Sequence, residues 1–442
     1  MTRRRPAPRA VFFLAIFLLF VIPLPAQSPP DASPTAASAG VAPFDPEAAT
    51  EAYLARLSPE QRARSDAYFE GGYWLQLWDF LIGLGIAWLL LGTGLSAGIR
   101  NRVERWTRHR WLQTLLYSGA TILLVTLLSF PMSLYEGFFR EHRYQLSNQS
   151  LGEWLKDVLV GVGVGLVLGG LALVTLYAVL RKAPKTWWIW GTAVSVAFSM
   201  FVALIFPVFI APLFNTYTPL RDTELRETIL ALARANGIPA NDVYQVDASR
   251  QSKRVSANVS GFAGTLRITL NDNLLNRCSP GEIQEVMGHE MGHYALNHVY
   301  EGLLFEGFII LVGFAFVRWS FERVARGFGR KWGVRGVGDV AGLPLLAALL
   351  SVTFFVLTPL NNTFTRVNEA EADLFGLNAT RQPDGAAEVA LKLGEYRKLS
   401  PGPLEEWIFF DHPGGRNRIL MAMRWKAEHL KDLSATSPSP AP

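Results

Sequence analysis

SPGEIQEVMGHEMGH, residues 279–293 of this 442-residue chain, carries the signals that decide the fold around it. Ser279 is a favourable helix N-cap, Pro280 suits the first helical position, and Glu282 can reach back to complete a capping box. The pattern therefore predicts a helix that begins at Pro280 and runs toward His298.

Two histidines and a glutamate lie in the second half of this predicted helix. Because residues four apart project from one helix face, His289 and His293 can bind the same ion. Glu290 then faces the position that the ion leaves open, where a zinc peptidase places the carboxylate that takes a proton from water. The alternative is a pair of histidines that only pack on an amphipathic helix, although the glutamate beside them would still need a partner if buried.

A third ligand must come from elsewhere in the chain. The single cysteine, Cys278, is too close to the motif to curl back onto it, so the ligand is expected to offer nitrogen or oxygen. Glu369 and Asp373 are four apart and share one face of another predicted helix, while Glu371 falls on the opposite side. One of the pair can bind metal while the other holds a ligand imidazole. An acidic helix start favoured by the macrodipole is the alternative, and spacing alone does not separate the two.

These motifs together resemble a known family. His-Glu-Met-Gly-His followed by Arg366-x-x-Glu369-x-x-x-Asp373 resembles the zinc-dependent, integral-membrane CAAX prenyl endopeptidases of type 1. Further stretches of similarity lie at residues 131–136, 141–148, 210–214, 256–261 and 412–413, so that the resemblance covers roughly residues 70 to 430. It implies that Glu369 is the third metal ligand, that Asp373 supports the site from behind, and that Glu371 has no role.

The resemblance also implies several residues that handle the substrate. Ala257 and Asn258 match a sheet edge at which the asparagine grips the substrate backbone, and an ordinary loop asparagine is the alternative. His412 matches a histidine that could stabilise the oxyanion of the tetrahedral intermediate, and Arg418 matches an arginine beyond it that we assign to substrate binding. A surface His-Pro turn would explain the same residues without function. His298 is rotated off the predicted metal face, and we interpret it as structural.

The composition predicts a membrane protein. Hydrophobic residues make up 50% of the chain and charged residues 18%, and the apolar ones are clumped. Six segments are long enough to cross a hydrocarbon core of about 30 Å, namely residues 74–98, 112–135, 157–180, 187–213, 302–320 and 341–360. Core helices of a soluble protein would instead carry charges every few residues. The predicted fold class is mainly α: a polytopic bundle of six or seven spans enclosing a chamber, with a zincin-like catalytic domain that contains a small β-sheet.

The domain organisation follows from these segments. We expect a signal peptide or retained signal anchor at 1–27, an extramembrane linker and helix at 28–72, four spans within 73–213, the first catalytic part at 214–300, two spans within 301–361, the second catalytic part at 362–432 and a disordered tail at 433–442. In the first catalytic part, residues 220–236 predict an amphipathic helix, and residues 243–246 and 266–270 predict strands.

The positions of the basic residues predict the orientation. Arginines and lysines gather after the first and third spans and between the last two, at residues 100–110, 181–185 and 318–335. The positive-inside rule makes that side cytoplasmic and the catalytic domain extracytoplasmic, as expected for a bacterial inner membrane. Eukaryotic members of the resembling family face the cytosol, which argues against a prenylated cytosolic substrate. The net charge of +5 suggests contact with lipid headgroups rather than nucleic acid.

The sequence therefore predicts a membrane-embedded endopeptidase that binds one Zn²⁺ per chain. By resemblance it cuts near the C-terminus of a lipid-modified or membrane-associated peptide, so its expected partners are a peptide or protein substrate and the lipid bilayer. A quality-control protease for membrane or secreted proteins, without prenyl specificity, is one alternative. The other is a non-catalytic membrane scaffold that keeps the zinc site as a staple.

Overall fold

The computed structural model describes residues 44–260 and 266–436. The predicted signal segment at 1–27 lies outside the described residues, as does the tail beyond Thr436. Helix α16 (Gly415–Thr436) runs past residue 433, so the predicted tail begins in a helix.

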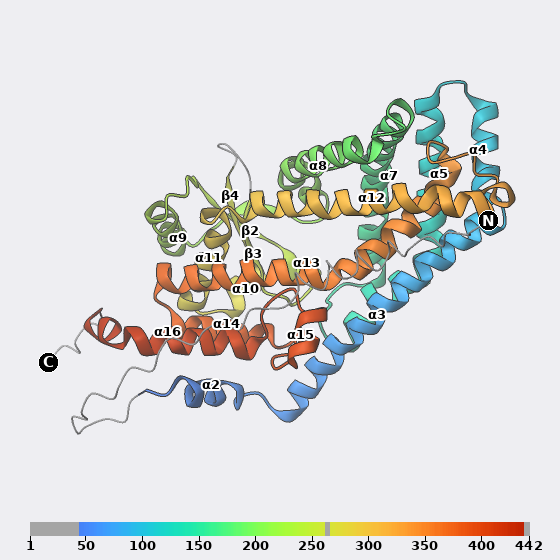
Figure 1. The fold of residues 1–442 in the computed structure, drawn as a ribbon. Coiled ribbons are helices and arrows are strands. Elements are labelled where there is room, and N and C mark those ends of the chain that lie inside the picture. Colours follow the sequence, from blue (N-terminus) through green and yellow to red (C-terminus); the bar gives the residue numbers. More distant parts are fainter. Residues whose placement is uncertain (1–43, 261–265, 437–442) are drawn as a thin grey trace, which may run out of the picture. The chain divides into compact units, whose positions relative to one another are not determined.

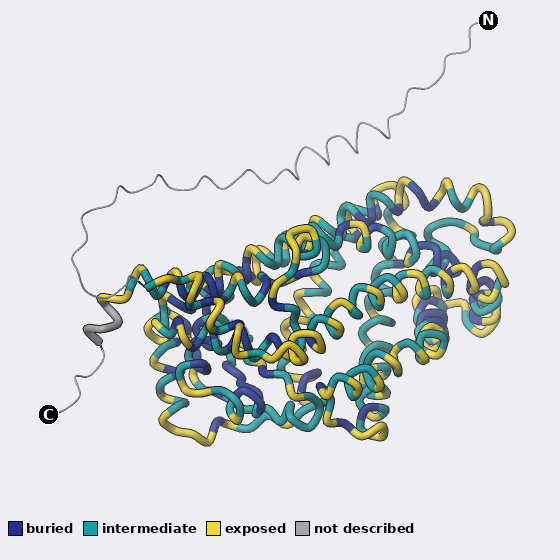
Figure 2. Tube along the Cα trace, turned by 90° about the horizontal axis from the view of Figure 1, so that it is seen from below, coloured by how far each residue is buried: buried dark blue, intermediate teal, exposed yellow. Residues whose placement is uncertain are grey.

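Six helices of the described part are long and apolar enough to span a membrane, which confirms the predicted number. They are α3 (Pro59–Gly92), α5 (Arg110–Leu134, continued by a π-helical turn at Tyr135–Arg140 and by α6 at Glu141–Arg143), α7 (Leu151–Lys182), α8 (Trp187–Ile205, extended to Leu213), α12 (His298–Trp332) and α13 (Leu343–Thr380). In the most apolar window of the first five, no more than 17% of the residues are buried. Figure 2 shows exposed and half-buried residues along these helices. Their apolar side chains therefore face outward, as lipid-facing helices require.

Two helix boundaries differ from the sequence prediction. α3 ends at Gly92, and a left-handed turn at Gly94 (φ 70°) leads into α4 (Leu95–Trp106), which carries arginines expected in a loop. α12 likewise continues to Trp332, so that most of the basic residues between the last two spans are helical. Arginine and lysine are good helix formers whose long stems can lie along apolar surface, so a cluster of them need not end a helix.

α13 joins two elements that the sequence analysis treated separately. It is one helix of 38 residues that contains both the apolar span predicted at 341–360 and the acidic segment with Glu369 and Asp373. In its most apolar window 44% of residues are buried, far more than in the other five helices. Figure 1 shows α13 running between α12 and α3 and on beneath α11. One continuous helix, which contains Pro359, therefore links the membrane helices to the metal centre.

A four-stranded sheet lies in the catalytic part, in the order β1-β2-β4-β3. The strands are β1 (Tyr217–Pro219), β2 (Val243–Val246), β3 (Ala257–Ser260) and β4 (Arg267–Asn271). β2 and β4 pair in parallel, and β1 and β3 are antiparallel to their neighbours. β2 and β4 were predicted from the sequence, whereas β1, a short strand that contains a proline, was not. β3 is an edge strand, whose outer backbone groups are open to a further strand.

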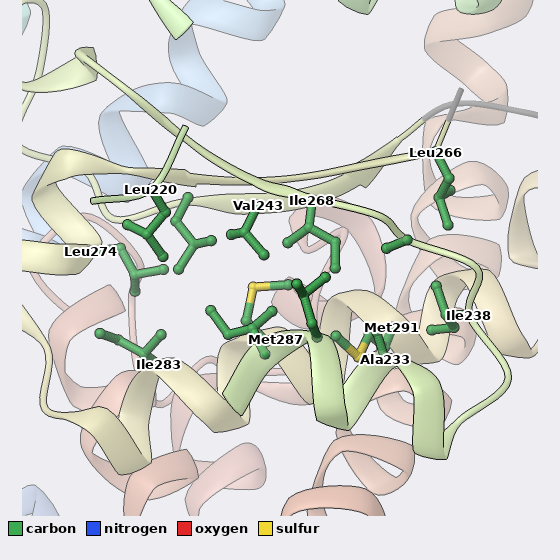
Figure 3. Close-up of a cluster of buried hydrophobic side chains, with 14 of the residues drawn as sticks. Leu220, Ala233, Ile238, Val243, Leu266, Ile268, Leu274, Ile283, Met287 and Met291 are labelled. Carbon is green, nitrogen blue, oxygen red and sulfur yellow. The ribbon is translucent and has the colours of Figure 1, made fainter. Parts of the chain in front are cut away.

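The core of this part lies between the sheet and helices α9 (Thr223–Ala235) and α11 (Pro280–Ala295) (Figure 3). Val243 and Ile268 on the sheet and Met287 and Met291 on α11 all have 0% of their surface exposed. Because these methionines project from one face of α11, packing against the sheet fixes how the helix is rotated and which face its histidines occupy.

Three further helices complete the catalytic part. α14 (Pro383–Leu393), α15 (Pro403–Phe409) and α16 follow α13, and α14 packs on α16. Helix α2 (Pro46–Leu54), from the other end of the chain, covers both. Arg416 of α16 pairs with Glu47 and Glu51 of α2, at 2.9 Å in each case.

Candidate metal centre

Helix α11 begins as its sequence predicts. The Ser279 side chain accepts a hydrogen bond from the backbone N–H of Glu282, and the Glu282 carboxylate accepts one from the backbone N–H of Ser279. Lys392 of α14 also contacts Glu282, at 2.6 Å, which ties the start of α11 to the second catalytic part. The capping box therefore sets the first turn of the helix that carries both histidines.

Two glycines of the motif let α13 approach α11 closely. A Cβ at Gly288 would lie 3.0 Å from the Cα of Gly376, and one at Gly292 would lie 3.1 Å from the Cα of Ala372. No larger residue fits at either position without moving a backbone. The motif therefore does more than supply ligands, because its small residues allow the helix with the third ligand to reach the histidines.

Three side-chain atoms converge where these helices meet. His289 Nε2 lies 3.2 Å from His293 Nε2 and 3.3 Å from Glu369 Oε2, and His293 Nε2 lies 3.4 Å from Glu369 Oε1. A tetrahedral zinc ion with bonds of about 2.0–2.1 Å separates its ligand atoms by roughly 3.3 Å. The predicted ligands are thus brought together at the spacing that one such ion requires.

The electrostatics of the cluster also suit a cation. Glu369 is buried, and its Oε2 accepts no well-formed hydrogen bond in the described part of the chain. Burial by itself lowers the pKa of the His289 imidazole, but the carboxylates of Asp373 and Glu369 outweigh this and raise it to about 10. The carboxylates around this ring thus favour an added positive charge, and two nitrogens with one carboxylate are a donor set that zinc accepts.

Asp373 contacts the ring nitrogen of His289 that faces away from the metal position. Its Oδ1 lies 2.8 Å from His289 Nδ1, which leaves Nε2 of the same ring free for metal. Arg418 was predicted to bind substrate, but in the structure it donates a hydrogen bond to this Asp373 oxygen. Arg418 also lines the cleft beside the cluster, so its predicted contact with substrate stays a prediction, and its contact with Asp373 adds a role in positioning that carboxylate.

His293 is held by His298, which in turn contacts Glu371. Neither contact was predicted from the sequence. His298 Nδ1 lies 3.0 Å from His293 Nδ1, and its Nε2 lies 3.3 Å from the Glu371 carboxylate. The carboxylate favours the tautomer with a proton on Nε2, so that Nδ1 can accept the proton of His293. The assignment of Glu371 as a bystander was therefore wrong.

His298 can reach His293 because the helix is interrupted between the two residues. α11 ends at Ala295 and α12 starts at His298, with Asn297 between them in the left-handed conformation (φ 64°). The helical spacing that seemed to rotate His298 away from the metal face does not continue through this turn. A short polar residue of the kind that tolerates positive φ was the available sequence signal.

His412 lies beside the cluster, in the connection between α15 and α16. Its Nε2 is 3.1 Å from Glu369 Oε2, and its Nδ1 is 2.8 Å from the Asp411 carboxylate. The Asp411 carboxylate can accept a hydrogen bond from Nδ1 and so fix the orientation of the ring. His412 is therefore near enough to the ion's position to contact a group that reacts there.

A cleft of about 180 Å³ opens onto this cluster. Glu290, Ala257 and His412 line it, together with His289 and Glu369. Burial raises the pKa of the Glu290 carboxyl, and the neighbouring histidines oppose this shift. A carboxyl with a raised pKa is a better proton acceptor than an ordinary surface glutamate.

The other predicted substrate residue, Asn258, lies on the edge strand. Ala257 pairs with Leu270 and Asn258 with Thr269 of β4, and α11 packs next to β3. The Asn258 side chain is exposed, and its Oδ1 accepts a hydrogen bond from Ser260 at 3.2 Å. The structure thus places both residues on the open edge beside the cleft.

Comparison with known proteins agrees with this geometry. Residues 46–216 match the family described as CAAX prenyl protease N-terminal, five membrane helices, and residues 219–426 match peptidase family M48. Four of the six candidate spans fall within the first match. The two matches together cover the membrane helices and all of the proposed metal ligands.

Individual relatives support the same assignment. An uncharacterized metalloprotease of Bacillus subtilis, YhfN, is 32% identical over 78% of this chain and 82% of its own. A CAAX prenyl protease 1 homolog of Oryza sativa subsp. japonica is 28% identical over 68% of this chain and 71% of its own. The crystal structure of S. mikatae Ste24p has the same fold, with a TM-score of 0.71 at 22% identity, over 86% of this chain and 95% of that one.

The fold and the relatives define a multi-pass membrane metallopeptidase. Within that class, the chain belongs to the CAAX prenyl protease family of the M48 peptidases.

Proposed function

We propose that this protein is a zinc endopeptidase in which His289, His293 and Glu369 hold the ion. The observation that carries the proposal is the convergence of the three side chains at the mouth of a cleft. The two ring nitrogens are 3.2 Å apart, and each lies 3.3–3.4 Å from one oxygen of the Glu369 carboxylate. Histidine nitrogens and a carboxylate, each backed by further polar groups, are a ligand set typical of catalytic zinc.

Each remaining polar residue then has a task in peptide hydrolysis. When bound, zinc polarises the scissile carbonyl and acidifies a water molecule. Glu290 takes the proton from that water and later delivers it to the leaving amine. His412 donates a hydrogen bond to the oxyanion that develops on the carbonyl oxygen. Asp373 and His298 keep the two ligand rings in the tautomer and orientation that the ion needs.

The substrate is expected to bind as an extended strand. β3 is an edge strand that borders α11, so a peptide can pair with its open backbone groups and pass across the cleft. Ala257 lines the cleft itself, and Asn258 is available to hold the peptide backbone at its rim. This mode of binding recognises backbone first and side chains second.

The named relatives suggest a lipidated substrate that is cut near its C-terminus. The distribution of basic residues favours a second candidate, a quality-control peptidase for membrane or secreted proteins. Arg100, Arg181 and Arg335, from three segments predicted to be cytoplasmic, line one cleft at the membrane end remote from the metal centre. By the positive-inside rule this distribution favours a catalytic part outside the cytoplasm, which in a bacterium would be the outer side of the inner membrane.

A peptide assay separates these possibilities. Purified protein in detergent is given matched prenylated and unprenylated peptides, with and without a chelator, and the products are identified by mass spectrometry. Metal chemistry requires that the chelator abolish cleavage and that added Zn²⁺ restore it. Faster cleavage of the prenylated peptide supports the first candidate, and equal cleavage supports the second. Cleavage that persists in chelator after loss of the metal has been verified would overturn the zinc proposal.

A further inference from the structure

A cleft with several arginines lies at the membrane end that is remote from the metal centre. We call it the basic cleft. It measures about 430 Å³ and is lined by α4, the start of α5, the end of α7 and the connection between α12 and α13. Its charged residues are Arg100, Glu104, Arg110, Arg181, Arg335 and Asp339. The stretch of α13 from Leu343, near this cleft, to Glu369 is roughly 40 Å long at the rise of an α-helix.

Two of the four arginines are neutralised within the protein. Arg100, whose side chain is 6% exposed, pairs with Asp339 and also donates to the backbone oxygen of Gly333 at 3.1 Å. Arg335 forms a bidentate pair with Glu104 at 2.8 and 3.1 Å. These two pairs hold α4 against the α12–α13 connection and give the basic cleft a fixed wall.

The other two arginines have no carboxylate partner in the described part of the chain. Arg181 donates only to neutral oxygens, Gly338 O at 3.2 Å and Thr114 Oγ1 at 3.0 Å. Arg110 is exposed, and its side chain makes no ion pair or hydrogen bond with any described residue. Four guanidinium groups against two carboxylates leave the basic cleft with a net charge of +2. Like charges that line one cleft repel each other unless an anion lies between them.

The position of the basic cleft is that of lipid headgroups. α5 begins at Arg110 and α7 ends at Lys182, so the two guanidinium groups without a carboxylate partner among the described residues lie where apolar helices end. Two neighbouring tryptophans are exposed, Trp106 by 77% and Trp111 by 57%. Exposed tryptophans at the ends of apolar helices are typical of the membrane–water interface.

We propose that the basic cleft binds the phosphate of an anionic phospholipid through Arg110 and Arg181. A guanidinium group offers a planar fork of N–H donors that matches two phosphate oxygens, and the cleft presents two such groups to one ligand. The tryptophans and the helix ends favour a lipid phosphate over a free one, because they place the site where headgroups are concentrated. The bound lipid ties together α5, α7 and the α12–α13 connection. The inference does not depend on the proposed peptidase function.

Lipid retention tests the proposal. The full-length protein in a neutral detergent is mixed with phosphatidylglycerol or with phosphatidylcholine of the same acyl chains, and bound lipids are counted by native mass spectrometry. We expect preferential retention of phosphatidylglycerol. Arg110→Gln should lower that retention about five-fold, the effect of one arginine near an anionic surface. Because the Arg110 side chain has no ion pair or hydrogen bond with the described residues, we expect this change to leave folding intact, and Arg110→Lys should keep most of the binding.

Arg108→Gln is the matched control, since Arg108 is exposed nearby but does not line the basic cleft. It should leave lipid retention unchanged. Equal retention of the two lipids by the unaltered protein, or equal losses in the two glutamine variants, would overturn the proposal. A further outcome is that inorganic phosphate or glycerol phosphate at millimolar concentration displaces the lipid completely. The basic cleft would then be a site for free phosphate, and the proposal of a bound phospholipid would be overturned.

Discussion

The catalytic part and the membrane helices are built from similar apolar residues that face opposite directions. Met287 of α11 has 0% of its surface exposed and packs under the sheet, whereas Leu159 of α7 is 70% exposed. In the catalytic part water drives apolar groups inward, so that polar ligands must be brought into an interior. Along the spans lipid removes that drive, and apolar side chains can remain outside. Hydrophobicity alone therefore does not tell which residues form a core.

α13 is the element in which the two regions meet. Its first half carries an apolar span, and its second half brings Glu369 and Asp373 to the metal centre. Buried carboxylates of this kind are stable only if cations and donors neutralise them. The contrast between the regions thus leads to specific expectations about which substitutions matter.

The largest effect on activity is expected for Glu290, which is proposed to take part in the reaction but is not needed for folding. Glu290→Gln should lower kcat by about 10²–10⁴-fold, because the variant cannot accept a proton from water. Metal content should stay the same, since Glu290 is not one of the three converging ligands. Peptide turnover and metal analysis of the same sample provide the measurement. Glu301→Gln, an exposed glutamate in the first turn of α12, is the control, and loss of metal from the Glu290 variant would contradict the assigned role.

A pair of truncations tests the contrast between the regions directly. Met287→Ala leaves a cavity under the sheet and should cost about 2–5 kcal/mol of the free energy of unfolding. Leu159→Ala removes a similar side chain from a lipid-facing surface and should change stability by less than about 0.5 kcal/mol. Thermal or denaturant unfolding in one detergent compares the two. Equal destabilisation would mean that Leu159 packs against protein and not lipid.

The next largest effect is expected for the residues that hold the metal-binding histidines in place by hydrogen bonds. Asp373→Asn removes the carboxylate that faces His289 Nδ1, and metal affinity should fall about 10–100-fold. Competition with a chromogenic chelator measures the change. Arg418→Gln, which leaves the carboxylate but removes its partner, should weaken metal binding by less. A larger loss for Arg418→Gln than for Asp373→Asn would instead make direct substrate or metal contact by Arg418 the better explanation.

The contact between His293 and His298 should give a smaller change. His298→Ala leaves the Nδ1 proton of His293 without an acceptor, and we expect about a ten-fold loss of metal affinity. His298→Asn retains an oxygen acceptor and should recover part of the loss, which a purely structural role would not produce. Glu371→Gln should have the smallest effect, a few-fold, because the Glu371 side chain is 56% exposed. Equal metal affinity in the Ala and Asn variants would remove His298 from the site.

Local signals predicted much of this protein correctly. The capping box formed by Ser279 and Glu282 marked the start of α11. The lengths of the apolar runs identified the six candidate spans. The resemblance pointed to Glu369, whereas spacing alone left its role open. The strand β1, at Tyr217–Pro219, was missed because three residues with a proline carry no alternating pattern and exist only through pairing with β2.

The geometry of His298 was misjudged for a physical reason. A spacing rule that holds within one helix was extended across a boundary between two helices. His298 was judged by the helical spacing from His293, but the turn at Asn297 redirects the chain. Arg418 was matched to the resembling family through its position after His412, and that position carried no sign of its contact with Asp373 of α13.

The sequence by itself determined the membrane class, the helix with His289 and His293, and the glutamate between them, because run length, capping and four-residue spacing act within one segment. Only the tertiary structure decided which groups stand behind each ligand and where free cations gather at the far end of the spans. Those contacts depend on how closely α13 approaches α11 and on which helix ends meet, and both follow from packing between segments distant in sequence.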